Sequence, residues 1–141
     1  MNDIHVRLAS WQKDNAELRR IREAVFIAEQ AVPAELEWDD EDSEAVHFLA
    51  LEGDYPIGTA RLLADGQIGR VSVLKDWRGL KVGDALMHAA IAEAEKRGQR
   101  EQKLSAQVHA TAFYERLGFH SEGTEYLEAG IPHVLMVRHS D

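Results

Sequence analysis

Cysteine is absent from this chain of 141 residues, which excludes disulfide bonds, thiolate metal sites and a cysteine nucleophile. Basic residues are also scarce, because 16 lysines and arginines stand against 25 aspartates and glutamates, for a formal net charge of −9. Nucleic-acid binding that is independent of sequence depends on cations that neutralise phosphates. We therefore expect no nucleic-acid partner.

Long apolar runs are missing as well. None approaches the roughly 20 residues that a helix needs to cross a bilayer, and Met1 to His5 lack the charged-then-apolar pattern of an export signal. We expect a cytoplasmic protein without a membrane partner. The length of 141 residues favours a single domain that covers residues 1–141.

Hydrophobic periodicity predicts a mixed α/β fold. Apolar residues alternate from Ile4 to Leu8, which indicates a strand, and they recur at helical spacing from Leu18 to Ala28. Asp14 and Glu17 resemble a capping box at the start of this helix, and Pro33 is expected to end it or to mark its exit loop.

The rest of the chain adds strands and helices in a definite order. Strands are expected at residues 46–51, 57–63, 67–74, 103–108, 119–125 and 134–138, and helices at 81–97 and 111–117. A loop that holds Gly130 and Pro132 is expected to join the last two strands. The predicted order is β-α-βββ-α-β-α-β-β, a mixed sheet without the repeated βαβ units of a dinucleotide-binding fold. The sequence does not determine the oligomeric state, but the exposed edges of such a sheet are compatible with a homodimer.

An acidic run lies between Glu35 and Glu44, where seven of ten residues are carboxylates. Such a run is usually a solvated loop because its charges repel one another. The alternative is a lip that attracts an amine, and Trp38 within the run suggests packing or ligand contact.

The stretch from Ile68 to Arg97 suggests an anion site. It consists of a strand, a turn rich in arginine and glycine at residues 77–83, and an amphipathic helix. A helix start offers unpaired N–H groups and the positive end of the helix dipole. The P-loop and Rossmann patterns are both absent, which argues against a nucleoside triphosphate with magnesium and against NAD.

Two motifs resemble those of the GNAT-type N-acetyltransferase superfamily. Residues 71–86, VSVLKDWRGLKVGDAL, look like motif A of that family (R/Q-x-x-G-x-G/A), and residues 110–119, ATAFYERLGF, look like motif B (A-x-x-F-Y-x-x-x-G-F). Residues 26–33, FIAEQAVP, and the acidic stretch after them resemble the small ElaA-like and YjcF-like branch. The resemblance implies the GNAT-like acyl-CoA N-acyltransferase fold.

The resemblance also implies acetyl-CoA as the donor. The pyrophosphate would bind backbone N–H groups at the helix start, and Arg78 would anchor the turn or reach a phosphate. The edge of the preceding strand would pair with the pantetheine arm, and the N–H of Val73 would stabilise the oxyanion. The implied cofactor-binding residues are Val71, Val73, Arg78, Gly79, Leu80, Lys81, Val82, Gly83, Asp84 and Gln107.

Two of these residues depart from the family's pattern. Lys81 stands where the middle glycine of motif A is usual, and Gln107 stands where many members have an asparagine that contacts pantetheine. The lysine side chain could crowd the turn or add a contact to phosphate. Because of these two departures, an alternative function remains: a catalytically weak module that binds or senses acyl-CoA.

The acceptor implied by the resemblance is a primary amine: a small amine, an exposed lysine or an N-terminus that attacks the thioester directly in a ternary complex. Tyr114 is the candidate general acid for the CoA thiolate. His109 is a candidate base, acting directly or through water. Glu29, Glu35, Glu37, Trp38 and His133 are candidates on the acceptor side. No histidine pair has the i, i+4 spacing of a helical metal site, so we expect no metal.

Overall fold

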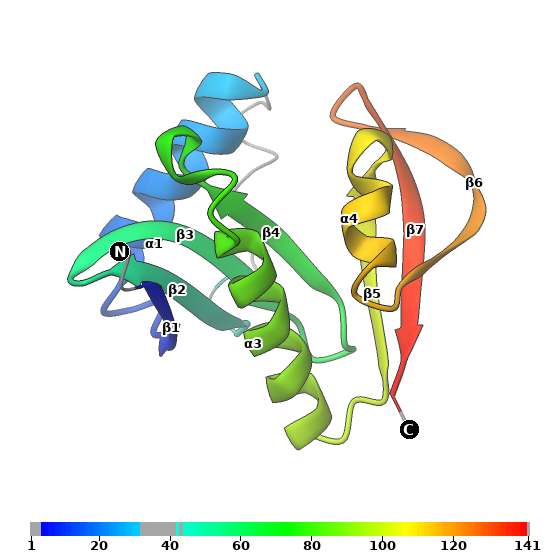
Figure 1. Cartoon of the computed structure of the whole chain (residues 1–141), viewed down its shortest axis with the longest axis horizontal. Coiled ribbons are helices and arrows are strands. Elements are labelled where there is room, and N and C mark those ends of the chain that lie inside the picture. Colours follow the sequence, from blue (N-terminus) through cyan, green and yellow to red (C-terminus); the bar gives the residue numbers. More distant parts are fainter. Residues whose placement is uncertain (1–3, 32–41, 43, 141) are drawn as a thin grey trace.

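The computed structural model describes residues 4–31, 42 and 44–140, and its strands form two antiparallel sheets (Figure 1). The first sheet has the order β1-β2-β3-β4, with β1 at Ile4–Ala9, β2 at Val46–Glu52, β3 at Tyr55–Leu62 and β4 at Ile68–Val73. The second has the order β5-β7-β6, with β5 at Glu101–Gln107, β6 at His120–Glu128 and β7 at Ile131–His139. The helices are α1 at Asn15–Arg22, α3 at Val82–Lys96 and α4 at Thr111–Glu115. The expected order of elements is confirmed.

Both faces of the first sheet are covered by helices. In β2, Phe48 and Ala50 pack in the main core together with Leu86 of α3. Leu49 and Leu51 belong to a second cluster, with residues of α1. Neighbouring residues of a strand point to opposite faces. This explains why β2 reads as an almost continuous apolar run rather than as an alternating one.

The two sheets touch at one end and diverge at the other (Figure 1). At the joined end Gln67 forms an isolated parallel bridge with Lys103, and the Lys103 N–H donates to the Gly66 carbonyl at 3.2 Å. Beyond this bridge, β4 is the edge of its sheet among the described residues. The divergence therefore leaves a backbone edge of β4 facing the gap toward β5.

A bulge interrupts β4 beside this gap. Arg70 has φ of +52°, and the register between β3 and β4 shifts next to it. The hydroxyl of Thr59 donates to the Arg70 carbonyl at 3.3 Å and lies 2.7 Å from the hydroxyl of Ser72. A bulge bends its strand and increases the local twist, so we attribute part of the divergence to it.

The first helix differs from its prediction. Asp14 lies at the N-cap position, but its side chain does not cap the helix. The carboxylate instead accepts from Arg7 at 3.1 Å and from the Ser10 N–H at 2.8 Å, so the predicted capping box is wrong. Helix α1 continues as a π-helical segment, Glu23–Glu29. Pro33, the expected end, lies outside the described residues.

The last hairpin is tighter than predicted. Ala129 and Gly130 have φ of +52° and +77° and connect β6 directly to β7. This two-residue geometry matches the twist of the flanking strands. Pro132 and His133, which were expected in a loop, therefore lie inside β7. None of the described helices is both long enough and apolar enough to cross a membrane.

Candidate functional site

The turn between β4 and α3 builds one wall of the candidate site. A 3₁₀ turn at Lys75–Trp77 follows β4, and Nε of Arg78 donates to the Val73 carbonyl at 3.0 Å. Arg78 thus anchors the turn to the end of β4. Lys81 adopts a left-handed conformation with φ of +63°, and α3 begins after it without a side-chain cap. The first N–H groups of α3 therefore remain available to a ligand.

A cavity of about 300 Å³, which we call the turn cavity, opens above this helix start. Its lining residues are Val73, Trp77, Arg78, Gly79, Lys81, Val82, Gly83, Asp84 and Phe113. Two cations and a helix N-terminus at one cavity favour an anionic ligand. Seven of the residues predicted to bind the cofactor lie here. Trp77 and Phe113 were missed as site residues, although both lie within the two sequence motifs.

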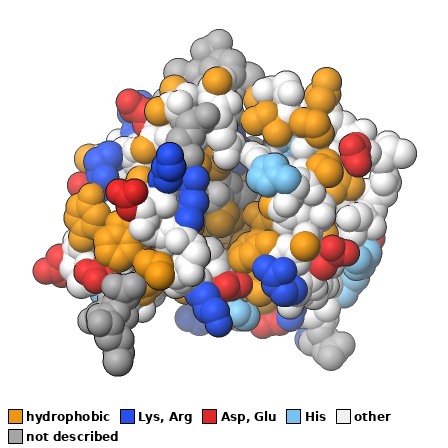
Figure 2. Space-filling model, turned by 45° about the horizontal axis from the view of Figure 1, so that its top comes forward, with side chains coloured by type: hydrophobic (Ala, Val, Ile, Leu, Met, Phe, Trp, Pro, Cys, Tyr) orange, Lys and Arg blue, Asp and Glu red, His pale blue; other side chains and the backbone are white. Residues whose placement is uncertain are grey.

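A second cavity, of about 220 Å³, lies between the β4 edge and the second sheet; we call it the sheet cavity. Its lining residues are Phe26, Gln30, Arg61, Gln67, Ile68, Gly69, Arg70, Val71, Leu104, Ser105, Gln107, Ala110, Tyr114, Glu128 and His133. Figure 2 shows a hollow on this side of the molecule, with lysine and arginine side chains on one rim and a histidine on the other. More than half of the residues that line this cavity have polar or charged side chains.

The two cavities adjoin along two elements. In β4, Val71 lines the sheet cavity and Val73 lines the turn cavity. In α4, Tyr114 lines the sheet cavity and its neighbour Phe113 lines the turn cavity. A ligand held at the start of α3 could therefore extend along the β4 edge and place its far end beside Tyr114.

Comparison with known proteins identifies the family. The model of the acetyltransferase (GNAT) domain matches residues 10–139. The chain belongs to this family. It is 39% identical to the uncharacterized N-acetyltransferase YjcF of Bacillus subtilis, over 84% of this chain and 87% of that protein. The GNAT assignment and the predicted ElaA-like and YjcF-like branch are thereby supported.

Solved structures agree with this assignment. Escherichia coli ElaA is 30% identical, with a TM-score of 0.85 over 96% of this chain and 99% of that one. The PaiA N-acetyltransferase of Thermoplasma acidophilum, solved in complex with coenzyme A, has a TM-score of 0.74 at 16% identity, over 97% of this chain and 99% of that one. The second likeness shows the fold alone. The predicted GNAT fold is confirmed, and the chain is an acyltransferase of this family.

Tyr114 is the acid candidate of this GNAT domain. Its ring packs edge-on against Phe113 and Phe119, with centroids 4.9 and 6.1 Å away. Burial raises the pKa of the Tyr114 phenol to about 12, because the phenolate would lose its hydration. The hydroxyl therefore keeps its proton at neutral pH.

Three predicted cofactor residues lie outside the turn cavity. Val71 and Gln107 line the sheet cavity, and Leu80 is exposed without lining either one. The Gln107 amide donates to Oε1 of Gln30 at 2.7 Å, and its oxygen lies 2.7 Å from Nε2 of His109. Gln107 is thus engaged on the sheet-cavity side, and its proposed contact with pantetheine stays a prediction.

The structure describes only some of the residues that were predicted to bind the acceptor. Glu35, Glu37 and Trp38 lie outside the described residues, and for Glu29 only the backbone, at the end of the π-helical segment, is described. His133 is buried and lines the sheet cavity. His109 is exposed, in the 3₁₀ turn after β5, and does not line that cavity. The roles assigned to these residues remain predictions.

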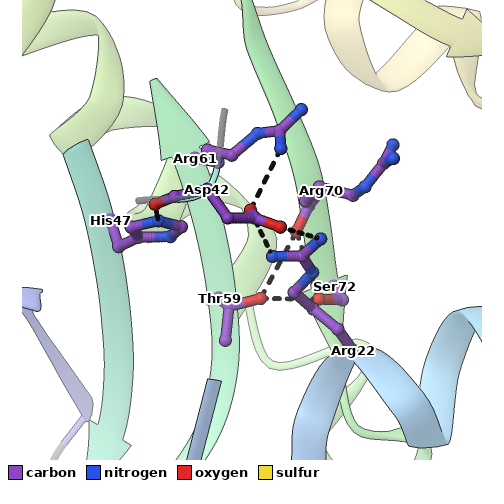
Figure 3. A network of polar contacts seen from close by, with 7 residues as sticks. All are labelled: Arg22, Asp42, His47, Thr59, Arg61, Arg70 and Ser72. Carbon is purple, nitrogen blue, oxygen red and sulfur yellow. Dashed lines mark hydrogen bonds and ion pairs between the residues drawn. The ribbon is translucent and has the colours of Figure 1, made fainter. Parts of the chain in front are cut away.

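One residue of the acidic run is not solvated. Asp42 is buried, and its Oδ1 accepts from Arg22 at 2.8 Å and from Arg61 at 3.0 Å (Figure 3). Nε2 of His47 lies 2.7 Å from the Asp42 carbonyl, and burial lowers the pKa of His47. The solvated-loop interpretation is therefore wrong for Asp42. The Asp42 carboxylate thus contacts α1 through Arg22 and β3 through Arg61, and Arg61 also lines the sheet cavity.

Metal-type side chains gather at one place in the described part of the chain. His120, Glu122 and His139 hold ligand atoms within 4.8 Å of one another, and all three are exposed. These residues line neither cavity. Cross-strand pairing of β6 and β7 brings the histidines together, which a search for helical spacing could not detect. The absence of a metal stays a prediction.

Proposed function

We propose that this chain is an N-acetyltransferase that moves the acetyl group of acetyl-CoA to a primary amine, by direct attack in a ternary complex. The observation that carries the proposal is the pair of adjoining cavities. The turn cavity suits the phosphates of the donor, and the sheet cavity suits a polar acceptor. Residues two apart in β4 border both, so a thioester lying along that edge would face the amine.

The donor would be held by backbone and charge together. N–H groups from Gly79 to Asp84 would bind the pyrophosphate, and the Lys81 ammonium at the rim would add charge. The Asp84 carboxylate stands in the first turn of α3, so we expect its N–H, not its side chain, to face the phosphates. The pantetheine amides would pair with the β4 edge. The Val73 N–H would then stabilise the oxyanion, an effect typically worth roughly 10²–10³ in rate.

The raised pKa of Tyr114 defines what this residue can do. A free thiol has a pKa of roughly 8.5, so a phenol with a pKa of about 12 would not surrender its proton completely to the CoA thiolate. We infer that Tyr114 donates a hydrogen bond to the departing sulfur. The net proton then reaches sulfur from the attacking nitrogen, directly or through water.

Two measurements on the purified chain test the proposal. Thermal shift should show stabilisation by acetyl-CoA and CoA but not by ATP with magnesium, because ligand that binds only the folded state raises the melting temperature. Thiol release should be followed with acetyl-CoA and a panel of spermidine, tyramine, glucosamine and a lysine-containing peptide. Turnover with any of these amines is the expected result. Tight acetyl-CoA binding without turnover on the whole panel would instead favour the acyl-CoA-sensing module.

A further inference from the structure

A row of polar side chains crosses the second sheet at the sheet cavity. His133 of β7 is the register partner of Gln107 in β5 and of Tyr126 in β6. Directly paired residues of antiparallel strands present their side chains on the same face. The Tyr126 ring stacks on His133 with centroids 6.2 Å apart, and its hydroxyl bonds the Ser105 hydroxyl. His133 is therefore held in the middle of a preformed polar surface.

The hydrogen bonding of His133 defines its tautomer. Nδ1 lies 2.6 Å from the Ile131 carbonyl oxygen, which can only accept, so Nδ1 carries a hydrogen. In the neutral ring Nε2 then holds the lone pair. Nε2 lies 3.4 Å from Oε2 of Glu128, which also lines the sheet cavity. A neutral ring thus presents its basic nitrogen beside a carboxylate.

Nε2 of His133 and the carboxylate of Glu128 can both accept hydrogen bonds, so together they suit a positively charged donor such as an ammonium group. The His133 side chain is 8% exposed and that of Glu128 is 52% exposed, so the carboxylate stands at the entrance and the imidazole lies deeper. Oε2 of Glu128 also lies 3.4 Å from the Ser105 hydroxyl. An ammonium entering the cavity would meet Glu128 first, and it could then donate a hydrogen to Nε2 of His133.

We propose that Glu128 and His133 form the acceptor-amine site, with Glu128 binding the ammonium and His133 acting as the general base. This inference rests on the proposed function. One proton passes from the ammonium to Nε2 of His133, and the neutral nitrogen forms the C–N bond with the thioester carbon. The C–S bond breaks with its electron pair on sulfur. The second proton leaves the nitrogen for the CoA thiolate, and His133 returns the first one to water.

His109 is less suited to this role than the sequence suggested. Its Nε2 lies 2.7 Å from the amide oxygen of Gln107, which can only accept, so that nitrogen carries a hydrogen. His109 thus donates toward the sheet cavity, and the cavity does not include it among its lining residues. The structure therefore assigns the base to His133. His109 would instead orient the Gln107 side chain through its hydrogen bond to the amide oxygen.

The same hairpin offers a matched control. His120 and Glu122 form a second His–Glu pair, at 3.0 Å, with side chains that are 56% and 48% exposed. Neither residue lines the turn cavity or the sheet cavity. Substitutions in this pair repeat the chemical change on β6 without touching the proposed site.

The experiment compares four variants with the wild-type chain on an amine from the panel that the wild type acetylates. His133→Gln should lower kcat by about 100-fold or more, because an amide can donate to the Ile131 carbonyl but cannot take a proton. Glu128→Gln should raise KM for the amine about tenfold and leave KM for acetyl-CoA unchanged. His120→Gln and Glu122→Gln should match the wild type. The thermal shift caused by acetyl-CoA should persist in all four.

Each contrary outcome has a separate meaning. If the wild type acetylated none of the amines in the panel, the proposed function would be overturned, and this inference with it. An active wild type whose kcat survives His133→Gln, or whose amine KM survives Glu128→Gln, would overturn only the inference. Because Glu128 is half exposed, its variant tests the site even if His133→Gln loses the acetyl-CoA thermal shift through misfolding. Addition of imidazole to His133→Gly should recover part of the lost turnover, which a purely structural histidine would not permit.

Discussion

Tyr114 shows how the surroundings of one side chain refine its role. Motif B pointed to this tyrosine as an acid, but the motif carries no information about its ionisation. Packing against Phe113 and Phe119 removes water and raises the pKa to about 12. The phenol therefore stays neutral over the physiological range, which fits the hydrogen-bond donor that we propose.

Replacing Tyr114 with phenylalanine should lower kcat by about 10- to 100-fold. The physical reason is the loss of one hydrogen bond to a charged sulfur, which is worth roughly 1.5–3 kcal/mol. The dissociation constant of acetyl-CoA, measured by calorimetry, should change little because Tyr114 lines the sheet cavity and not the turn cavity. An unchanged kcat would remove Tyr114 from the mechanism.

The pH dependence of the free energy of unfolding, compared between the wild type and Tyr114→Phe, tests whether Tyr114 is buried. The unfolded chain has a tyrosine pKa of about 10, and the pKa of Tyr114 in the folded chain is about 12. Between these values the unfolded state loses the proton first, so stability that is present below pH 10 is lost as pH rises. The loss is at most about 3 kcal/mol. Urea titrations of wild type and Tyr114→Phe should diverge in this alkaline window and run parallel at neutral pH.

The residue just before helix α3, Lys81, has a strained backbone. Lys81 adopts φ of +63°, a region that L-residues other than asparagine and aspartate rarely occupy. Glycine would adopt it freely. The departure from motif A therefore strains the turn while it places an ammonium at the rim of the turn cavity. The sequence left crowding of the turn and phosphate contact as alternatives; the structure shows a left-handed backbone at Lys81, and the phosphate contact stays a prediction.

Lys81→Gly should raise the free energy of unfolding by about 0.5–1 kcal/mol, because relief of strain exceeds the added flexibility of the unfolded chain. It should also raise KM for acetyl-CoA several-fold, since one cation is lost at the phosphates. Denaturant titration and steady-state kinetics measure the two effects. Lys81→Ala is the control, because it removes the charge and keeps the strain. Equal stability of the glycine and alanine variants would show that strain is not stored there.

The divergence of the two sheets is the feature of the whole molecule that creates the site. Gly66 holds the sheets together at their joined end. It has φ of +89°, and a Cβ atom at this position would lie 2.4 Å from the Glu101 carbonyl oxygen. Glycine is required here both for the turn and for the approach of β5. This joint sets how far apart β4 and β5 begin, and with it the width of the sheet cavity.

Gly66→Ala should lower the free energy of unfolding by about 2–4 kcal/mol, through backbone strain and displacement of β5. Gly53→Ala is the matched control, since Gly53 also has positive φ, at +58°, in a hairpin turn, but a Cβ there meets nothing within 4 Å. It should lose only the strain, roughly 1–2 kcal/mol. Chemical denaturation of both variants measures the difference. Equal losses would contradict a role for Gly66 in joining the sheets.

Local patterns determined much of this protein from the sequence alone. The order of strands and helices, the turn from Trp77 to Gly83 and the Phe113–Tyr114 motif all depend on neighbours within a few residues, where periodicity and backbone hydrogen bonding leave a readable trace. Where local chemistry had competing partners the prediction failed, as when the Asp14 carboxylate bound Arg7 instead of capping α1.

Tertiary structure decided which distant residues meet. Asp42 became a buried partner of Arg22 and Arg61, 20 and 19 residues away, although the run around it predicted solvent. Glu128 joined His133 only because the turn at Ala129–Gly130 is two residues long and places both strands in register. Strand register and sheet divergence depend on packing across the whole core, which no short stretch of sequence encodes. For this reason the proposed donor site could be predicted from the sequence, while the pairing of Glu128 with His133 in the proposed acceptor site required the fold.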